Sequence, residues 1–239
     1  MTGKVIMGSS VNSQKKILII YYSYSSQTKN LLQAIMNGME SYPVSVSMQR
    51  IEPVVPQHFP FGSVSKTIWK MVLTFFRQRL AIQPLPESCF QHYDLIILAG
   101  PTWSYNPSGP VLALFDRDGK KLFKDQMVIP LISCRGYWRM HWWGLKALLK
   151  KCGATVPNLI VFSHPSKEPW RTLGVFLKLA GKVPERIPWM KKHYRKYGHT
   201  RAQLVEAERF GTQIAEVLVS GGDTGSIEFK TDPALYNKS

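Results

Sequence analysis

Short apolar runs that alternate with amphipathic segments are the feature that most constrains how this chain folds. Five such runs have the length of strands, at residues 16–22, 44–51, 93–100, 126–133 and 157–164. Most of them are apolar throughout, as in strands covered on both faces, whereas residues 44–51 alternate as in a strand near a sheet edge. Helix patterns follow at residues 28–38, 109–117, 142–154 and 200–222. This alternation predicts an α/β fold with a five-stranded parallel sheet, right-handed crossovers and helices on both faces.

The domain organisation follows from the same pattern. A chain of 239 residues fits one large domain, which we place at residues 16–220, between a flexible lead-in at 1–15 and a mobile tail at 221–239. Two segments are additional to this alternation of strands and helices. Residues 59–86 contain a helix pattern whose apolar face we expect to cover the sheet. Residues 165–199 form an insertion before the last helix, and it is rich in aromatic and basic residues.

Charge and cysteine content narrow the partners and the compartment. The net charge of +16 favours an acidic partner, such as an anionic membrane, a phosphorylated cofactor, nucleic acid or an acidic protein. The three cysteines lack metal-ligand spacing, so we expect a reducing, cytoplasmic compartment and no metal. No apolar run reaches the roughly 18 residues of a spanning helix, and the first residues do not resemble a secretory signal.

The loop after the first strand gathers hydroxyl groups at the start of a helix. Its candidate residues are Ser23, Ser25, Ser26, Gln27 and Thr28. Free N–H groups at a helix N-terminus attract anions, and nearby hydroxyls add donors, so the loop is a candidate phosphate site. Simple helix capping by Ser and Thr explains the composition equally well. The Gly and Lys of a nucleotide-hydrolysing phosphate loop are missing.

Two further loops leave buried strands at the same edge of the predicted sheet. The second loop offers Pro101, Thr102, Trp103, Ser104, Tyr105 and Asn106, and the third offers Ser133, Arg135, Gly136, Tyr137 and Trp138. Aromatic rings there can flank a planar ligand while amides bond its edge. Taken singly, the loops are also consistent with a proline-rich turn and a solvated basic face. Because all three meet at the carboxyl ends of the strands, they favour a phosphorylated aromatic cofactor.

Two of these stretches resemble a known family. The sequence "IIYYSYSSQTKN", residues 19–30, resembles the flavodoxin phosphate loop, with Ser26 where that loop usually has glycine. The sequence "LAGPTWSYNPSGPVLALFDR", residues 98–117, resembles the loop that flanks the flavin ring in flavodoxin-like NAD(P)H oxidoreductases. Residues 133–154 and the insertion are also similar to a subgroup associated with dialkylresorcinol-type gene clusters.

The resemblance implies a flavodoxin-like three-layer sandwich that binds FMN. The phosphate would lie on residues 23–28, and the ring would lie between residues 101–106 and residues 135–138. The chemistry would be that of the flavin, which passes electrons or hydride from NAD(P)H to a quinone-like or other aromatic or lipidic acceptor without a catalytic side chain.

Two alternatives stay open from the sequence. One is a flavodoxin-type electron carrier without NAD(P)H activity of its own, although such carriers are usually acidic. The other is a flavin-free module that binds an anionic membrane or a partner. Whichever of these holds, the insertion is expected to be a lid over the flavin, a homodimer contact, a peripheral membrane segment on the cytoplasmic face, or a solvated helix packed by its apolar side. Nucleic acid is the least favoured partner, since no recognition motif accompanies the charge.

Overall fold

A parallel sheet forms the centre of the computed structural model, which describes residues 14–194 and 197–235. The parallel strands are β1 (Lys15–Tyr21), β2 (Val44–Arg50), β3 (Leu95–Trp103), β5 (Val128–Cys134) and β6 (Ile160–Ser163). Their order in the sheet is β2-β1-β3-β5-β6. The parallel α/β prediction is therefore confirmed. The predicted number of strands is one too low, because the two-residue strand β4 (Asn106–Pro107) pairs antiparallel with β3.

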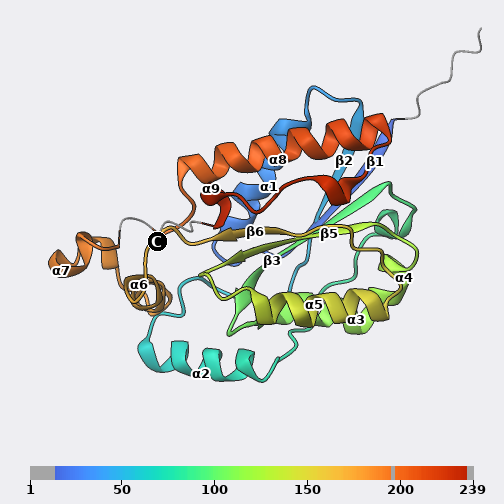
Figure 1. Cartoon of the computed structure of the whole chain (residues 1–239). Coiled ribbons are helices and arrows are strands. Elements are labelled where there is room, and N and C mark those ends of the chain that lie inside the picture. The colour runs from blue at the N-terminus through green and yellow to red at the C-terminus, as the bar shows by residue number, and fades with distance from the viewer. Residues whose placement is uncertain (1–13, 195–196, 236–239) are drawn as a thin grey trace, which may run out of the picture.

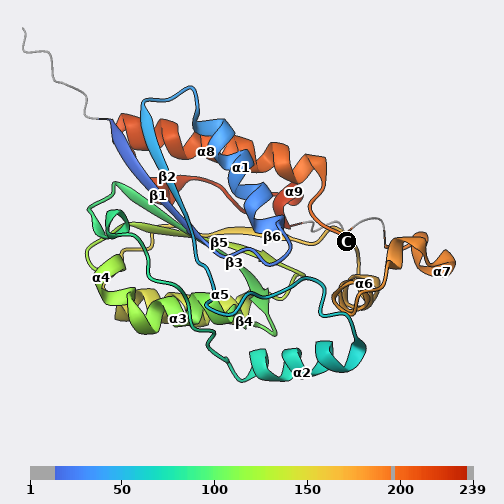
Figure 2. The same ribbon diagram turned by 180° about the vertical axis from the view of Figure 1, so that it is seen from behind.

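Helices cover both faces of this sheet, as Figure 1 and the reverse view in Figure 2 show. One face carries α1 (Gln27–Met39) and α8 (Arg201–Ser220), and the other carries α3 (Gly109–Arg117), α4 (Gly119–Phe123) and α5 (Arg139–Lys151). Side chains of β1 alternate between two cores, so Ile19 packs with α1 and α8 while Ile20 packs on the opposite face. Counting parallel strands only, the order 2-1-3-4-5 is that of the flavodoxin-like doubly wound fold.

The ends of the long helix α8 follow from its sequence. The Thr200 hydroxyl accepts a hydrogen bond from the Gln203 N–H at 3.2 Å, and the Gln203 side chain accepts one from the Thr200 N–H at 3.1 Å. Gly221 ends the helix in the left-handed conformation. Midway along α8, a Cβ on Gly211 would lie 1.9 Å from the Ile35 carbonyl oxygen, so only glycine lets α8 cross α1 this closely.

The expected position of the helix within residues 59–86 is wrong. We expected its apolar face to cover the sheet, but α2 (Val64–Phe75) lies outside both helical layers, at the bottom of Figure 1. Thr67 is its one buried residue, and most of its large apolar side chains are exposed. Helices α3 and α5 already cover this face of the sheet. An amphipathic pattern specifies an apolar face but does not specify what covers that face.

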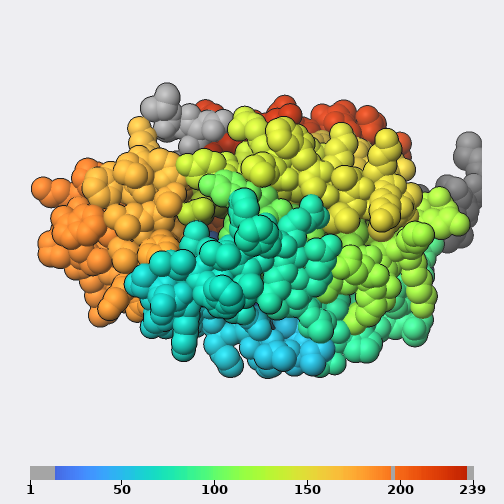
Figure 3. Space-filling view, turned by 90° about the horizontal axis from the view of Figure 1, so that it is seen from below, coloured from blue at the N-terminus to red at the C-terminus, as the bar shows by residue number. Residues whose placement is uncertain are grey.

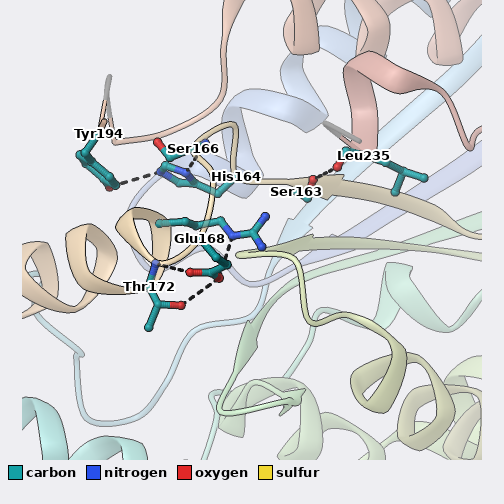
Figure 4. Close-up of polar contacts among 8 residues, drawn as sticks. Ser163, His164, Ser166, Glu168, Thr172, Tyr194 and Leu235 are labelled. Carbon is teal, nitrogen blue, oxygen red and sulfur yellow. Dashed lines mark hydrogen bonds and ion pairs between the residues drawn. The ribbon is translucent and has the colours of Figure 1, made fainter. Parts of the chain in front are cut away.

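Between β6 and α8 the chain forms α6 (Trp170–Leu179), the 3₁₀ turn η2 (Pro184–Arg186) and α7 (Pro188–Lys191). This part packs on itself, since Met190 and Tyr194 are fully buried. Figure 4 shows Glu168 turned toward the start of α6, where its carboxylate accepts hydrogen bonds from the N–H and the hydroxyl of Thr172 at 3.1 and 2.9 Å. Burial alone would raise the pKa of Glu168, but these bonds and the Arg171 guanidinium lower it.

Residues 221–235 belong to the segment expected as a mobile tail, and in this structure they pack on the domain. They form a turn, η3 (Thr224–Ser226), and a short helix, α9 (Asp232–Leu235). Phe229 is buried, and its ring centroid lies 4.9 Å from that of Phe210. The Ser163 hydroxyl donates a hydrogen bond to the Leu235 carbonyl. Apolar residues at 227, 229 and 234 enter the core, which explains the order. Residues 236–239 and most of the lead-in, 1–13, lie outside the described residues. Within the described part of the chain, no helix is both long and apolar enough to cross a membrane.

Candidate functional site

The loops that leave β1, β3 and β5 meet at the carboxyl edge of the sheet, beside the point where strand order reverses between β1 and β3. Two adjoining chambers open there and share Tyr24, Thr102, Trp103, Arg135, Val175 and Leu179 as lining residues. The chamber nearer α1, here called the polar chamber, holds about 610 Å³ of empty space including its open mouth, and the second, the apolar chamber, holds about 570 Å³.

The first loop lines the polar chamber at the end where α1 begins. Ser25, Gln27 and Thr28 line it. The free N–H groups of the first turn of α1 lie at the same place, because the helix begins at Gln27. Ser23 is turned away and buried, and its hydroxyl accepts the Lys29 N–H at 3.4 Å. The capping explanation therefore holds for Ser23, whereas Ser25 and Thr28 line the chamber.

Ser26 has the backbone conformation that a glycine favours. Its φ is 63° and its ψ is −4°, in the left-handed region, and its side chain makes no capping hydrogen bond. A non-glycine residue in this conformation costs about 1 kcal/mol or more. The loop thus keeps the shape of a glycine turn at the start of α1, although it carries a serine there.

Some residues of the second loop line the chambers, and others bind α2. Residues 101–103 line the polar chamber, and the Trp103 ring lies edge-on to Tyr22 and Tyr24 at 5.6 and 5.7 Å between centroids. Ser104 lines the apolar chamber, and its hydroxyl donates to the Met71 carbonyl at 2.9 Å. Tyr105 is outside both linings. Asn106 is outside them too, and its side-chain amide donates to two carbonyls at the end of α2, those of Thr74 and Phe75.

The third loop contributes Ser133 and Arg135. Ser133 lies 3.1 Å from His199, measured from Oγ to Nε2, and Arg135 lines both chambers. Gly136, with φ of +146°, is covered by the Arg171 guanidinium, which would lie 2.7 Å from a Cβ at that position. Tyr137 and Trp138 line neither chamber. Tyr137 instead contacts Tyr105, with ring centroids 5.7 Å apart.

The structure adds lining residues that the strand-loop argument missed. The apolar chamber lies between α2 and α6, and their contributions are Lys70, Met71, Thr74, Val175, Phe176 and Leu179, with Phe61 from the segment before α2. Cys134, His164 and Tyr197 complete the polar chamber. Both segments stood out in the sequence as aromatic and basic additions, and that composition was the available signal. The lid interpretation placed residues 165–199 near the loops, whereas nothing in the sequence placed the helix of residues 59–86 there.

The described charged side chains that line the chambers are all positive. Lys70 and Arg135 are the cationic residues among the described lining, and no described Asp or Glu joins them. Cations together with a helix N-terminus favour an anionic ligand, and partial burial strengthens the effect because water screens it less. The lining suits a ligand with an anionic group at the α1 end and an apolar body elsewhere.

Buried titratable groups around the chambers are held neutral. Burial lowers the pKa of His141 and of His164 to about 3 and that of His199 to about 4. The Ser166 N–H donates to Nδ1 of His164, so Nε2 carries the proton and donates to the Tyr194 hydroxyl at 3.2 Å. Figure 4 shows this pair. Burial raises the pKa of Cys134 to about 12, which makes its thiolate scarce at neutral pH. These groups are poor proton donors or nucleophiles there.

Aromatic rings close the polar chamber toward residues 165–199. Tyr197 stacks on Phe59 with centroids 5.5 Å apart and donates its hydroxyl to Ser25 Oγ at 3.2 Å. Tyr24 stacks on Phe61 at 5.3 Å. Segments from three parts of the chain therefore meet above the first loop. Among residues 14–194 and 197–235, no cluster of three or more His, Cys, Asp and Glu side chains could hold a metal ion.

No protein-family model and no curated protein sequence matches the chain. Solved structures similar to it include a flavoprotein from Lactobacillus acidophilus in complex with FMN, at 21% identity and a TM-score of 0.47, over 61% of this chain and 91% of that one. A flavodoxin from the domain Archaea has 17% identity and a TM-score of 0.48, over 85% and 98%. A WrbA-like flavodoxin from Agrobacterium tumefaciens has 14% identity and a TM-score of 0.46, over 86% and 98%. Values this low carry no inference about ligand or reaction, and the flavodoxin-like fold of this chain rests on its own strand order.

Proposed function

We propose that the protein binds FMN in the polar chamber and is an oxidoreductase that uses NAD(P)H to reduce a quinone-like or other aromatic or lipidic acceptor. The observation that carries the proposal is the joined pair of chambers. One end is built from a helix N-terminus with the hydroxyls of Ser25 and Thr28, and the other end is lined by Met71, Phe176 and Leu179. Such a cavity matches a ligand with a phosphate on a flat, largely apolar body.

The residues fit the cofactor in their chemistry. The first turn of α1, Ser25 and Thr28 would hold the phosphate, and Arg135 would add a positive charge beside the ring. Trp103 and Tyr24 would border the ring, since both line the two chambers. When bound, FMN supplies the chemistry by accepting a hydride from NAD(P)H and passing two electrons to the acceptor. The protein's part is to bind, orient and keep water out.

The apolar chamber supports the proposed acceptor class. Its apolar walls are Met71, Val175, Phe176 and Leu179. The Thr74 hydroxyl is already bonded to that of Ser104 at 2.7 Å, so an apolar ring is favoured over a small polar acceptor. A tryptophan at position 71, introduced by Met71→Trp, would fill this chamber. It should reduce turnover of the quinone menadione while leaving the affinity for FMN within about twofold, because Met71 does not line the polar chamber.

The test is the visible spectrum of the purified protein, before and after FMN is added and the excess removed. About one flavin per chain is expected, and the Thr28→Ala and Trp103→Ala variants should each bind FMN at least about tenfold more weakly. Thr155→Ala, at an exposed threonine in the loop before β6, is the matched control. Unchanged affinity in both site variants would put the cofactor elsewhere.

Steady-state oxidation of NAD(P)H with menadione then separates the enzyme from an electron carrier, which would bind FMN yet react slowly with NAD(P)H. A colourless protein that refuses FMN would instead support the flavin-free module. One observation favours that alternative: the hydrogen bond from the Tyr197 hydroxyl to Ser25, which FMN phosphate would have to replace.

A further inference from the structure

The outer face of α2 is an apolar surface that the rest of the described chain leaves uncovered. Its members are Val64, Ile68, Trp69, Val72, Phe75 and Phe76, and we call them the α2 stripe. They recur at helical spacing, so they point the same way. Trp69 is 61% exposed and Phe76 is 76% exposed. Large apolar side chains gathered on one exposed face mark an interaction surface, whereas scattered ones do not.

The stripe is held in this outward orientation by bonds on the opposite side of the helix. Ser104 and Asn106 bind main-chain carbonyls at Met71, Thr74 and Phe75. Met71 and Thr74 also line the apolar chamber, so the inner edge of α2 is occupied. The helix thus has a polar anchor on one side and an exposed stripe on the other. Its exposed face is therefore part of the ordered structure.

The two helices that carry this surface, α2 and α5, contain Lys and Arg but no acidic residue. Residues 53–86 contain no Asp or Glu, and neither do residues 126–167, which include α5. Lys66, Lys70 and Arg77 make no salt bridge with any described residue. Arg77 approaches α5, since a Cβ on Gly144 would lie 3.8 Å from its Nη1.

Helix α5 extends the surface beside α2. Met140 and Trp143 are exposed on it, next to the exposed cations Arg139 and Lys146. Figure 3 looks at this side of the molecule: α2, in teal, fills its centre, with α5, in yellow, on one side and α6 and α7, in orange, on the other. Exposed aromatic and basic residues of α2 and α5 thus belong to two neighbouring helices on this side of the molecule.

We propose that this face docks on an anionic membrane surface, with the α2 stripe inserted among the lipids. A basic helix with Trp, Phe and Ile on one side is suited to lie in the plane of the headgroups. Each Lys or Arg near an anionic leaflet adds attraction, and because α2 and α5 contain no acidic residue, they add no opposing repulsion. A second copy of the chain is disfavoured on this face, because both copies would bring the same positive charge.

Docking there would place the gap between α2 and α6 next to the lipids. For this step the inference rests on the proposed function: an acceptor carried in the membrane would reach the apolar chamber directly. The docking itself rests only on exposed residues of α2 and α5. It can therefore stand if FMN does not bind, and it can fail while FMN binds.

The test is co-sedimentation of the full chain with vesicles, with and without added FMN. Vesicles of phosphatidylcholine with one-third phosphatidylglycerol should bind the protein, and pure phosphatidylcholine vesicles should bind it much less. High salt should release it. Trp69→Ala with Phe76→Ala should lower the partition coefficient by about tenfold or more, and Lys66→Gln by about fivefold. Lys230→Gln, at an exposed lysine near α9, is the charge control.

Trp189→Ala, on α7, is the aromatic control, because Trp189 is 55% exposed on the segment where the sequence suggested membrane contact. A loss with Trp189→Ala and none with the Trp69 and Phe76 variant would overturn the proposal and move the contact to the insertion. So would the absence of binding to anionic vesicles. A dimer in light scattering without lipid, abolished by the Trp69 and Phe76 changes, would assign the face to a second copy instead.

Discussion

Helices α1 and α2 have 13 and 12 residues, both are amphipathic, and both border the chambers, yet they use their apolar faces differently. Helix α1 buries Leu31, Leu32 and Ile35 completely between the sheet and α8. Helix α2 buries one threonine and leaves its apolar stripe in solvent. The difference teaches that periodicity sets which side of a helix is apolar, while the tertiary neighbours decide whether that side becomes core or interface.

Hydrogen exchange should show the largest difference between the two helices. Amides in the middle of α1 should open only with global unfolding, at about 5–15 kcal/mol for a typical domain. Amides of α2 should open locally at a small fraction of that free energy, since the helix buries little. Equal protection in both helices would mean that α2 belongs to the cooperative core.

The same substitution in each helix should sharpen the comparison. Ile35→Ala should lower the free energy of unfolding by about 2–5 kcal/mol, because Ile35 is fully buried and a cavity would remain. Ile68→Ala should change it by less than about 0.5 kcal/mol, because Ile68 is 51% exposed. Urea unfolding followed by circular dichroism measures both. A comparable loss in the two variants would contradict the exposed position of α2.

Acid should weaken the packed layers before it affects α2. His141, His164 and His199 have folded pKa values of about 3, 3 and 4, below the ordinary value of 6.5. The unfolded chain therefore binds more protons below pH 6.5. Stability is complete above that pH and falls as the pH drops toward 3. Each histidine should remove up to about 2 kcal/mol between pH 6.5 and 5.

Urea unfolding at the two pH values measures this loss, and His141→Gln should reduce it by one histidine's share. The local opening of α2, followed by hydrogen exchange corrected for intrinsic rates, should not change over the same range. A flat stability profile would show that the three imidazoles are not buried as neutral groups.

The first residues of the two helices provide the smallest contrast. Ser26 precedes α1 in a left-handed conformation and its side chain makes no capping bond, whereas the Ser63 hydroxyl caps α2 by accepting the Lys66 N–H at 3.2 Å. Ser26→Gly should raise global stability by up to about 1 kcal/mol. Ser63→Ala should lower the free energy of local opening of α2 by about 1 kcal/mol and leave the free energy of global unfolding nearly unchanged.

A matched glycine substitution separates stability from binding. Asp125→Gly relieves a left-handed residue with φ of 57° outside both chambers. It should not alter FMN binding, whereas Ser26→Gly should improve binding by easing the first loop. If both variants shift FMN affinity equally, the Ser26 conformation has no specific role in the site.

Much of the fold was predictable because it depends on local patterns. The strands at residues 16–22 and 93–100, the Thr200 cap and the Gly221 stop all follow from apolar runs and capping chemistry, and each is present within a few residues of its expected place. The two-residue strand β4 was not predictable, since it depends on how the second loop folds back on β3.

The candidate site was predictable only in its strand-derived part. Parallel strands bring their carboxyl ends to one edge, so Ser25, Thr28, Trp103 and Arg135 could be expected to meet. Helices α2 and α6 enter the same cavity from segments far away in the sequence. Asn106 and Ser104 looked like ligand-binding residues but bind the end of α2, because a polar side chain satisfies whichever partner the fold presents.

By itself, the sequence determined the alternation of strands and helices, the basic charge, the position of the hydroxyl loop and the amphipathic character of each helix. These properties reside in neighbouring residues and need no distant partner. Only the tertiary structure decided that α1 packs into the core while α2 faces solvent. It also decided that α6 lies against α2 and that residues 222–235 pack on the domain. Each of these outcomes depends on which surfaces are left uncovered once the sheet and its two layers have formed, and no local pattern contains that information.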